Sequence, residues 1–189
     1  MTVQILRRRF TVEEYYRIAA AGILHEDVWV ELIDGEIVQM AAIGSKHAAG
    51  VKRLIVLFSH HTGQRFLIGA QDPVRLSQYS EPQPDIALLR LRPDYYAGAH
   101  PGPGDVLLLV EVMVTSEEYD REVKVSLYAR SGIVEVWLVD LEADHVEVYR
   151  SPGPEGYRQV QRVHRGERLA PEAFPHLKLL ADDVLGPHA

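Results

Sequence analysis

Cysteine is absent from the 189 residues of this chain. Its absence excludes disulfide bonds and thiolate metal sites, and it fits a reducing compartment. Long hydrophobic runs are also missing, since none approaches the roughly 20 apolar residues that cross a bilayer. The three arginines near the N-terminus are not followed by the apolar stretch of a secretory signal. We therefore expect a cytoplasmic protein that does not associate with membranes.

Positive charge is scarce, with 20 lysines and arginines against 27 aspartates and glutamates and a net charge of −7. An acidic chain repels nucleic acid at long range, which argues against a DNA partner. One acidic cluster that holds a divalent metal would account for part of this imbalance. With 47% hydrophobic residues, the chain is long enough for one well-buried globular domain, which we expect to span residues 1–189.

Local patterns predict helices and strands in alternation. Thr11 and Glu14 have the spacing of a capping box, and the helix that follows is expected to close at Gly22. The dipeptide Asp34-Gly35 suits a tight type I′ turn between two short strands. Further strands are expected at residues 65–70, 72–76, 84–90, 106–114, 134–140, 145–150 and 157–163, and further helices at 48–63, 117–130 and after Pro171. This order indicates an α/β or α+β fold around a central sheet.

One predicted strand contains a residue that is unfavourable to bury. Residues 106–114 are apolar on both faces except for Glu111, and an ionised carboxylate without a partner would be neutralised in such a place. Asp85 follows Pro84, which cannot donate to a sheet ladder, so we expect Asp85 at a strand start or on an edge. Two carboxylates that converge from adjacent strands suit Mg²⁺, which would give Glu111 a positive partner.

A lysine on the following helix completes this set. Asp120, Lys124 and Tyr128 are spaced by four residues and share one face of the predicted helix. If this helix packs on the sheet, the lysine reaches the neighbourhood of Glu111 and can orient a metal-bound water or stabilise charge on a phosphate. A plainer interpretation stays open, in which Asp120 and Lys124 form a solvated ion pair and Tyr128 belongs to the core.

These residues follow one another in an order that resembles a known family. The matching stretches are ELIDGEIV from Glu31, His47 after a short loop, QPDIALL from Gln83, LVEV around Glu111, and D-x-x-x-K-x-x-x-Y from Asp120. Together, from about Phe10 to Tyr149, they resemble the putative restriction endonuclease family of bacterial proteins, formerly a domain of unknown function. That family belongs to the PD-(D/E)XK nuclease superfamily.

The resemblance implies a restriction-endonuclease-like core, a mixed central β-sheet flanked by helices, with Mg²⁺ at its middle strands and Mn²⁺ as a possible substitute. Asp85 corresponds to the motif aspartate and Glu111 to the (D/E) position. The lysine of the motif is missing from the strand, because Val112-Met113 follows Glu111, and Lys124 is expected to replace it from the helix. Relatives usually carry Ser-Pro-Ser where this chain has Val-Thr-Ser at residues 114–116.

The same resemblance gives supporting roles to other residues. Glu31 is expected to assist the metal, although an outward position on an edge strand is equally open. The candidates for orienting the lysine or contacting the substrate are Asp120, Tyr128, His47 and Gln83. The basic residues Lys46, Lys52, Arg53 and Arg121 are expected near the site, where they could contact the DNA backbone.

The expected activity is Mg²⁺-dependent cleavage of DNA by an endonuclease that leaves 5′-phosphate and 3′-hydroxyl ends. A homodimer is expected, because cutting both strands needs two sites. The alternative is a nuclease-fold protein that no longer cuts and serves as a binding or assembly module. The acidic net charge and the lack of a separate DNA-recognition domain favour this alternative. The nearly complete set of carboxylates and lysine argues against it, because a retired site has no reason to retain buried charges.

Overall fold

The computed structural model describes residues 8–24, 28–63, 65–114 and 120–187, apart from the side chain of Asp120. Its centre is a six-stranded sheet in the order β3-β4-β5-β6-β7-β8. The strands are β3 (Leu67–Gly69), β4 (Ile86–Leu89), β5 (Val106–Met113), β6 (Glu135–Asp140), β7 (His145–Gly153) and β8 (Gly156–His164). Neighbouring strands are antiparallel except for β5 and β6, which run parallel. The sheet is therefore mixed, as expected.

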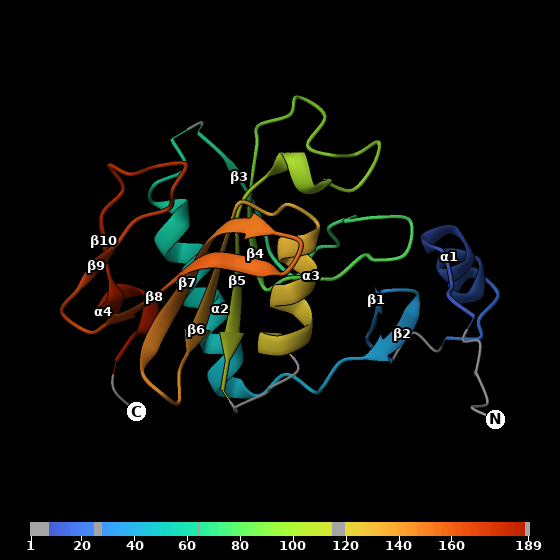
Figure 1. Ribbon diagram of the computed structural model, residues 1–189, viewed down its shortest axis with the longest axis horizontal. Coiled ribbons are helices and arrows are strands. Elements are labelled where there is room, and N and C mark those ends of the chain that lie inside the picture. Colours follow the sequence, from blue (N-terminus) through green and yellow to red (C-terminus); the bar gives the residue numbers. More distant parts are fainter. Residues whose placement is uncertain (1–7, 25–27, 64, 115–119, 188–189) are drawn as a thin grey trace.

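Two helices, α2 (Ser45–Ser59) and α3 (Val125–Arg130), lie on opposite faces of this sheet (Figure 1). Because parallel neighbours need a crossover connection, the chain leaves the sheet between β5 and β6. The crossover contains a π-helical turn, Asp120–Lys124, which leads directly into α3. The helix expected at 117–130 is thus described only from Asp120, because residues 115–119 lie outside the described part of the chain.

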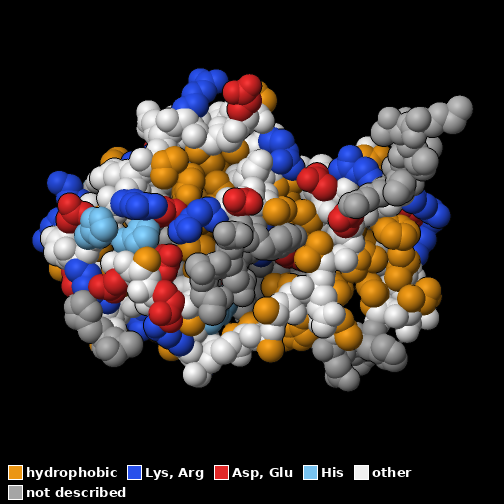
Figure 2. Space-filling view, turned by 60° about the horizontal axis from the view of Figure 1, so that its bottom comes forward, with side chains coloured by type: hydrophobic (Ala, Val, Ile, Leu, Met, Phe, Trp, Pro, Cys, Tyr) orange, Lys and Arg blue, Asp and Glu red, His pale blue; other side chains and the backbone are white. Residues whose placement is uncertain are grey.

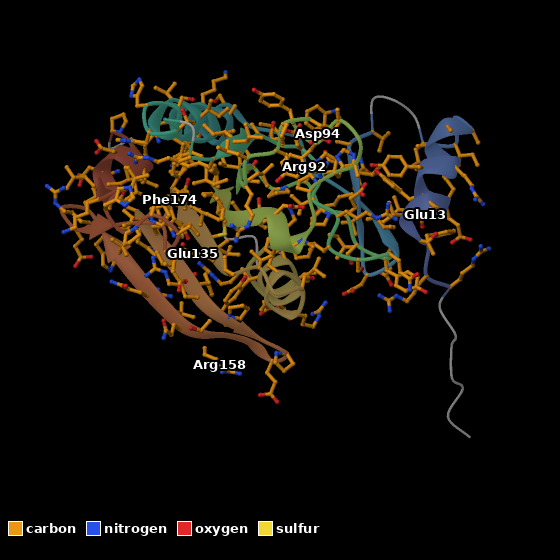
Figure 3. The ribbon with its side chains drawn as sticks, turned by 90° about the horizontal axis from the view of Figure 1, so that it is seen from above. Glu13, Arg92, Asp94, Glu135, Arg158 and Phe174 are labelled. Carbon is orange, nitrogen blue, oxygen red and sulfur yellow. The ribbon has the colours of Figure 1, made fainter. Side chains whose placement is uncertain are left out.

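The two ends of the chain add smaller elements at opposite sides of the molecule. The N-terminal side holds α1 (Val12–Ala20) and a hairpin of β1 (Val30–Ile33) and β2 (Glu36–Gln39). Figure 3 shows Glu13 on α1 on the opposite side of the molecule from Phe174.

The C-terminal side closes against the first long helix. The small strands β9 (Arg168–Leu169) and β10 (Leu179–Leu180) pair with each other, and α4 (Ala181–Leu185) packs beside α2. This last helix confirms the short helix predicted after Pro171.

The local signals of the N-terminal elements are present as predicted. Thr11 Oγ1 accepts a hydrogen bond from Glu14 N at 3.2 Å, and Glu14 Oε2 accepts one from Thr11 N at 3.1 Å. These two bonds complete the capping box of α1. In the hairpin turn, Asp34 (φ +50°) and Gly35 (φ +83°) both have left-handed backbone conformations. This is the geometry of a type I′ turn.

The prediction of a strand at residues 72–76 is wrong, because this segment is an irregular connection between β3 and β4. Its amides bond outside any ladder, as Val74 N donates to Pro82 O at 2.9 Å. Pro73 has no amide hydrogen to donate, and Gln71 has a left-handed backbone with φ +58°. These two residues interrupt the extended, donating backbone that a strand requires.

The core consists of two apolar layers, one on each face of the sheet. Along β5, Val110 and Val112 pack into the layer that includes residues of α2, whereas Leu109 and Met113 pack into the layer that includes residues of α3. Because side chains alternate along a strand, Glu111 points toward the α3 face. The sheet therefore presents this carboxylate to the helix that carries the candidate lysine.

Candidate active site

The two carboxylates predicted from the strands lie side by side. Asp85 immediately precedes β4, and the pairing of Ile86 with Val110 places it next to Glu111 on β5. Asp85 N donates to Glu111 Oε2 at 3.1 Å. Asp85 is 7% exposed and Glu111 is 3% exposed. Both groups are thus buried, so each needs partners that stabilise its charge.

Lys124 lies between two carboxylates. Its Nζ is 3.3 Å from Glu31 Oε1 and 3.7 Å from Glu111 Oε1, and the residue is only 5% exposed. One helical turn later, Tyr128 donates its hydroxyl hydrogen to Glu111 Oε1 at 2.5 Å. The ammonium therefore reaches the neighbourhood of Glu111, as the four-residue spacing indicates. Tyr128 belongs to the core, as the plainer interpretation had it, but it also holds the buried glutamate.

Glu31 points inward from β1 and is 2% exposed. Its Oε2 accepts a hydrogen bond from Gln83 N at 3.1 Å, and Gln83 Nε2 donates to Val30 O at 3.1 Å. The outward position on an edge strand is therefore wrong for this glutamate. Gln83 connects the N-terminal hairpin to the segment that carries Asp85, which brings the third carboxylate to the site.

His47 lies in the first turn of α2, and its Nε2 is 2.9 Å from Asp85 Oδ2. The same oxygen accepts a hydrogen bond from Val112 N at 2.9 Å. The helix approaches β5 closely because Gly50 has no side chain. A Cβ atom at position 50 would lie 2.9 Å from Val112 Cγ1 and 3.1 Å from Leu141 Cδ1. Close packing of helix and strand thus brings the histidine to the aspartate.

Gln71 is a site residue that the sequence did not reveal. Its Nε2 donates to Asp85 Oδ1 at 3.2 Å, although it lies on the loop after β3. Gln71 has a left-handed backbone, and a sequence predicts this conformation only where it has a residue that favours it, such as glycine or asparagine. Glutamine gives no such signal. Its proximity to Asp85 arises from the path of the loop.

These side chains line one cavity of about 550 Å³. Its charged and polar lining comprises Glu31, His47, Gln71, Gln83, Asp85, Glu111 and Lys124. The remaining lining is mostly apolar and comes from residues 38–44, between β2 and α2, and from residues 112–114 at the end of β5. The cavity thus combines a buried charged floor with an apolar rim.

The charges in the cavity are unbalanced. When ionised, Glu31, Asp85 and Glu111 carry three negative charges, whereas the cations facing them among the described residues are the ammonium of Lys124 and, when protonated, His47, so one or two negative charges remain in excess. A divalent cation would compensate them, and Mg²⁺ typically takes one or two carboxylates and keeps several waters. Among the described residues no three acidic or histidine side chains are grouped as ligands of one ion. The two carboxylates that could hold such a hydrated ion are those of Asp85 and Glu111.

Two of the basic residues expected to touch DNA are paired with acidic side chains. Lys46 Nζ is 3.0 Å from Glu142 Oε1, and Arg121 Nε is 3.2 Å from Glu147 Oε2. Burial alone would raise the pKa of Glu147, but hydrogen bonds from Tyr149 and His145 and the charge of Arg121 hold it below its usual value. Burial of its hydroxyl, with a smaller contribution from the hydrogen bond to the Glu147 carboxylate, raises the pKa of Tyr149 to about 12.

The other two basic candidates lie away from the site cavity. Lys52 and Arg53 line a separate cavity with Asp183, and Arg53 Nη1 donates to Leu185 O at 2.6 Å. Their expected position near the site is therefore wrong, because they lie on the side of α2 that meets α4. On the face shown in Figure 2, Lys and Arg side chains are interspersed with Asp and Glu. The side chain of the candidate Asp120 lies outside the part of the chain that the structure describes, and so do residues 115–116.

Comparison with known proteins identifies a matching family and a similar solved structure. Residues 12–182 match the model of the Uma2 family, described as "Putative restriction endonuclease". A solved structure of a putative nuclease belonging to DUF820, from Anabaena variabilis ATCC 29413, superposes with a TM-score of 0.70. It is 18% identical, and the match covers 93% of this chain and 97% of that one, so the two share a fold. No curated protein matches the chain.

Within the described residues, no helix is both long and apolar enough to cross a membrane. The family match extends over all the elements that form the candidate site, from β1 to α3. The chain therefore belongs to the Uma2, or putative restriction endonuclease, family and has a restriction-endonuclease-like fold.

Proposed function

We propose that this protein is a Mg²⁺-dependent DNA endonuclease of the PD-(D/E)XK type. The observation that carries the proposal is the buried pair of Asp85 and Glu111 with Lys124 beside it in one cavity. The fold and the family match support nuclease activity. The unbalanced negative charge of the cavity supports the metal.

In this proposal Asp85 and Glu111 hold the metal. Bound there, Mg²⁺ would polarise the scissile phosphate and activate the attacking water. Glu31 holds the ammonium of Lys124 at the cavity wall, since Lys124 Nζ lies closer to Glu31 Oε1 than to Glu111 Oε1. The protein thereby supplies two acidic ligands and one fixed positive charge.

Lys124 occupies the role of the lysine that is missing from β5. Two carboxylates stabilise its positive charge, and a charged ammonium donates hydrogen bonds but accepts none. Its role is therefore to orient the attacking water and to stabilise negative charge on the phosphate. The water would attack phosphorus in line and lose a proton to solvent, the bond to the 3′-oxygen would break, and this oxygen would take up a proton, so that the products carry 5′-phosphate and 3′-hydroxyl ends.

The decisive test is cleavage of supercoiled plasmid and single-stranded DNA with Mg²⁺ or Mn²⁺. We expect metal-dependent nicking by the wild type and its loss in both Asp85→Asn and Lys124→Met. Saturating metal should also raise the melting temperature of the wild type, because a ligand at about 100 times its Kd stabilises by about 2.7 kcal/mol. The increase should be much smaller in Asp85→Asn, which lacks one ligand charge.

Asp94→Asn is a matched control, since Asp94 lies on the loop between β4 and β5 and pairs with Arg92 (Figure 3). This variant should cut and bind metal like the wild type. Cleavage retained in Asp85→Asn would remove Asp85 from the site. Absence of any metal-dependent cleavage by the wild type would contradict the proposed activity itself.

One observation favours the alternative of a non-catalytic binding module. Lys124 and Tyr128 already give the carboxylate of Glu111 two partners, so its burial is tolerable without a metal. The module predicts no increase in melting temperature with Mg²⁺ or Mn²⁺. Thermal titration with metal alone therefore separates the two functions before any DNA is added.

A further inference from the structure

Gln71 has a backbone conformation that is unfavourable for its side chain. Its φ of +58° lies in the left-handed region, which glycine adopts freely and most other residues rarely adopt. The backbone is held there by its own amide, because Gln71 N lies 3.1 Å from both Pro84 O and Asp85 O. Strained residues of this kind persist where the surrounding structure fixes them, often at functional sites.

The side chain of Gln71 meets one particular oxygen of Asp85. Oδ2 already has two donors, His47 Nε2 and Val112 N, each at 2.9 Å. A carboxylate offers about four acceptor positions, two on each oxygen. Within the described residues, Oδ1 accepts only from Gln71 Nε2, at 3.2 Å. Oδ1 is therefore the oxygen that retains a place for a metal, and Gln71 is the side chain that orients it.

We infer that Gln71 is a positioning residue for the metal site, an inference that rests on the function proposed above. Its backbone and side chain both bond to the segment Pro84–Asp85, so the backbone bonds fix the amide donor next to its target. An amide donor is neutral and leaves the negative charge of Asp85 available to the cation, whereas a lysine or arginine would compensate it. The strained backbone is the consequence of aiming this amide into the cavity.

Gln71→Gly separates a positioning role from a structural one. Glycine relieves the left-handed backbone, which offsets part of the loss of the hydrogen bond to Asp85, so the metal-free variant should melt close to the temperature of the wild type or slightly below it. Loss of the amide should weaken Mn²⁺ binding about tenfold, because residues that orient a metal ligand typically contribute 10–100-fold to metal affinity. Calorimetric titration with Mn²⁺ alone gives the affinity. In the cleavage assay, the Mn²⁺ concentration that gives half of the maximal rate should rise, whereas most of the maximal rate should be retained.

Ser151→Gly is the matched control, because Ser151 also has a left-handed backbone (φ +57°) and does not line the cavity. It should leave the Mn²⁺ affinity unchanged. Wild-type affinity in Gln71→Gly would overturn the positioning role and leave the nuclease proposal standing. Failure of the wild type itself to bind Mn²⁺ would overturn both. A large fall in metal-free melting temperature together with unchanged affinity would assign Gln71 to the fold instead.

Discussion

At the scale of single residues, one ammonium serves two buried carboxylates. Lys124 lies on the helix side of the site, yet its Nζ contacts Glu31 from the N-terminal hairpin and Glu111 from the central strand. The chemistry depends on where the positive charge lies, and the long flexible side chain of a lysine can bring its ammonium to that position from another element. A lysine missing from the motif strand is therefore compatible with a complete set of charges.

Tyr128→Phe tests how the buried glutamate is held. The change removes the hydroxyl that donates to Glu111 Oε1 and leaves the aromatic ring in the core. We expect the free energy of unfolding to fall by about 1.5–3 kcal/mol, the contribution of a hydrogen bond to a charged group. Urea denaturation without metal measures it.

Tyr157→Phe is the comparison, since the Tyr157 hydroxyl donates to the neutral carbonyl oxygen of Ile133 at 2.7 Å. Its expected loss is smaller, about 0.5–1.5 kcal/mol. Equal losses in the two variants would mean that the acceptor at Tyr128 is not charged in the folded protein.

At the scale of elements, the contact between α2 and β5 decides where His47 lies. Gly50 allows the helix to approach Val112, whose amide holds the same aspartate oxygen as the histidine. Gly50→Ala should destabilise the fold by about 1–3 kcal/mol, because the added methyl overfills a packed core. Displacement of α2 should also lower the rate of metal-dependent cleavage.

Thermal and urea unfolding measure the first effect, and the plasmid assay measures the second. Gly104→Ala is the control, since a Cβ atom at that position would meet no heavy atom within 4 Å. A stable, fully active Gly50→Ala protein would show that the helix can shift without moving the histidine.

A second element effect concerns the π-helical turn Asp120–Lys124. Turns of this type insert a residue into the helical repeat and occur frequently at functional sites. Here the turn ends at Lys124, and the four-residue spacing from Lys124 to Tyr128 is kept in α3. Both side chains consequently reach the same oxygen of Glu111.

At the scale of the whole molecule, net charge limits the affinity for DNA. The chain carries −7, and two of the basic residues expected to contact DNA, Lys46 and Arg121, are paired with carboxylates. We therefore expect few phosphate contacts and a shallow salt dependence, with a slope of log K against log salt between about −1 and −3, given about −0.9 for each contact. Fluorescence anisotropy with the Asp85→Asn variant measures binding without cleavage.

A slope steeper than about −6 would imply many phosphate contacts by the same relation and would contradict this reading of the surface. We also propose a homodimer, because cleavage of both strands needs two sites. Sedimentation of the protein with and without DNA measures the number of subunits, and a monomer in both conditions would predict nicks rather than double-strand breaks.

Much of the fold is determined by short-range signals in the sequence. The capping box of Thr11 and Glu14, the turn at Asp34-Gly35 and the apolar run around Glu111 each lie within a few residues, and each forms as predicted. The wrong strand at residues 72–76 has the opposite cause. Its alternating pattern suits a strand, but the amides of Gln71 and Val74 bond to residues 82–85 instead of to a neighbouring strand.

The sequence by itself determined which charged residues are unfavourable to bury, since a glutamate within an apolar run and an aspartate after a proline are visible without a structure. Only the tertiary structure decided which groups meet them. Glu31 reaches Lys124, His47 reaches Asp85 through the close approach at Gly50, and Gln71 is brought in by its loop. The local sequence determines which buried charges need partners, whereas close packing between elements distant in sequence determines which side chains become those partners.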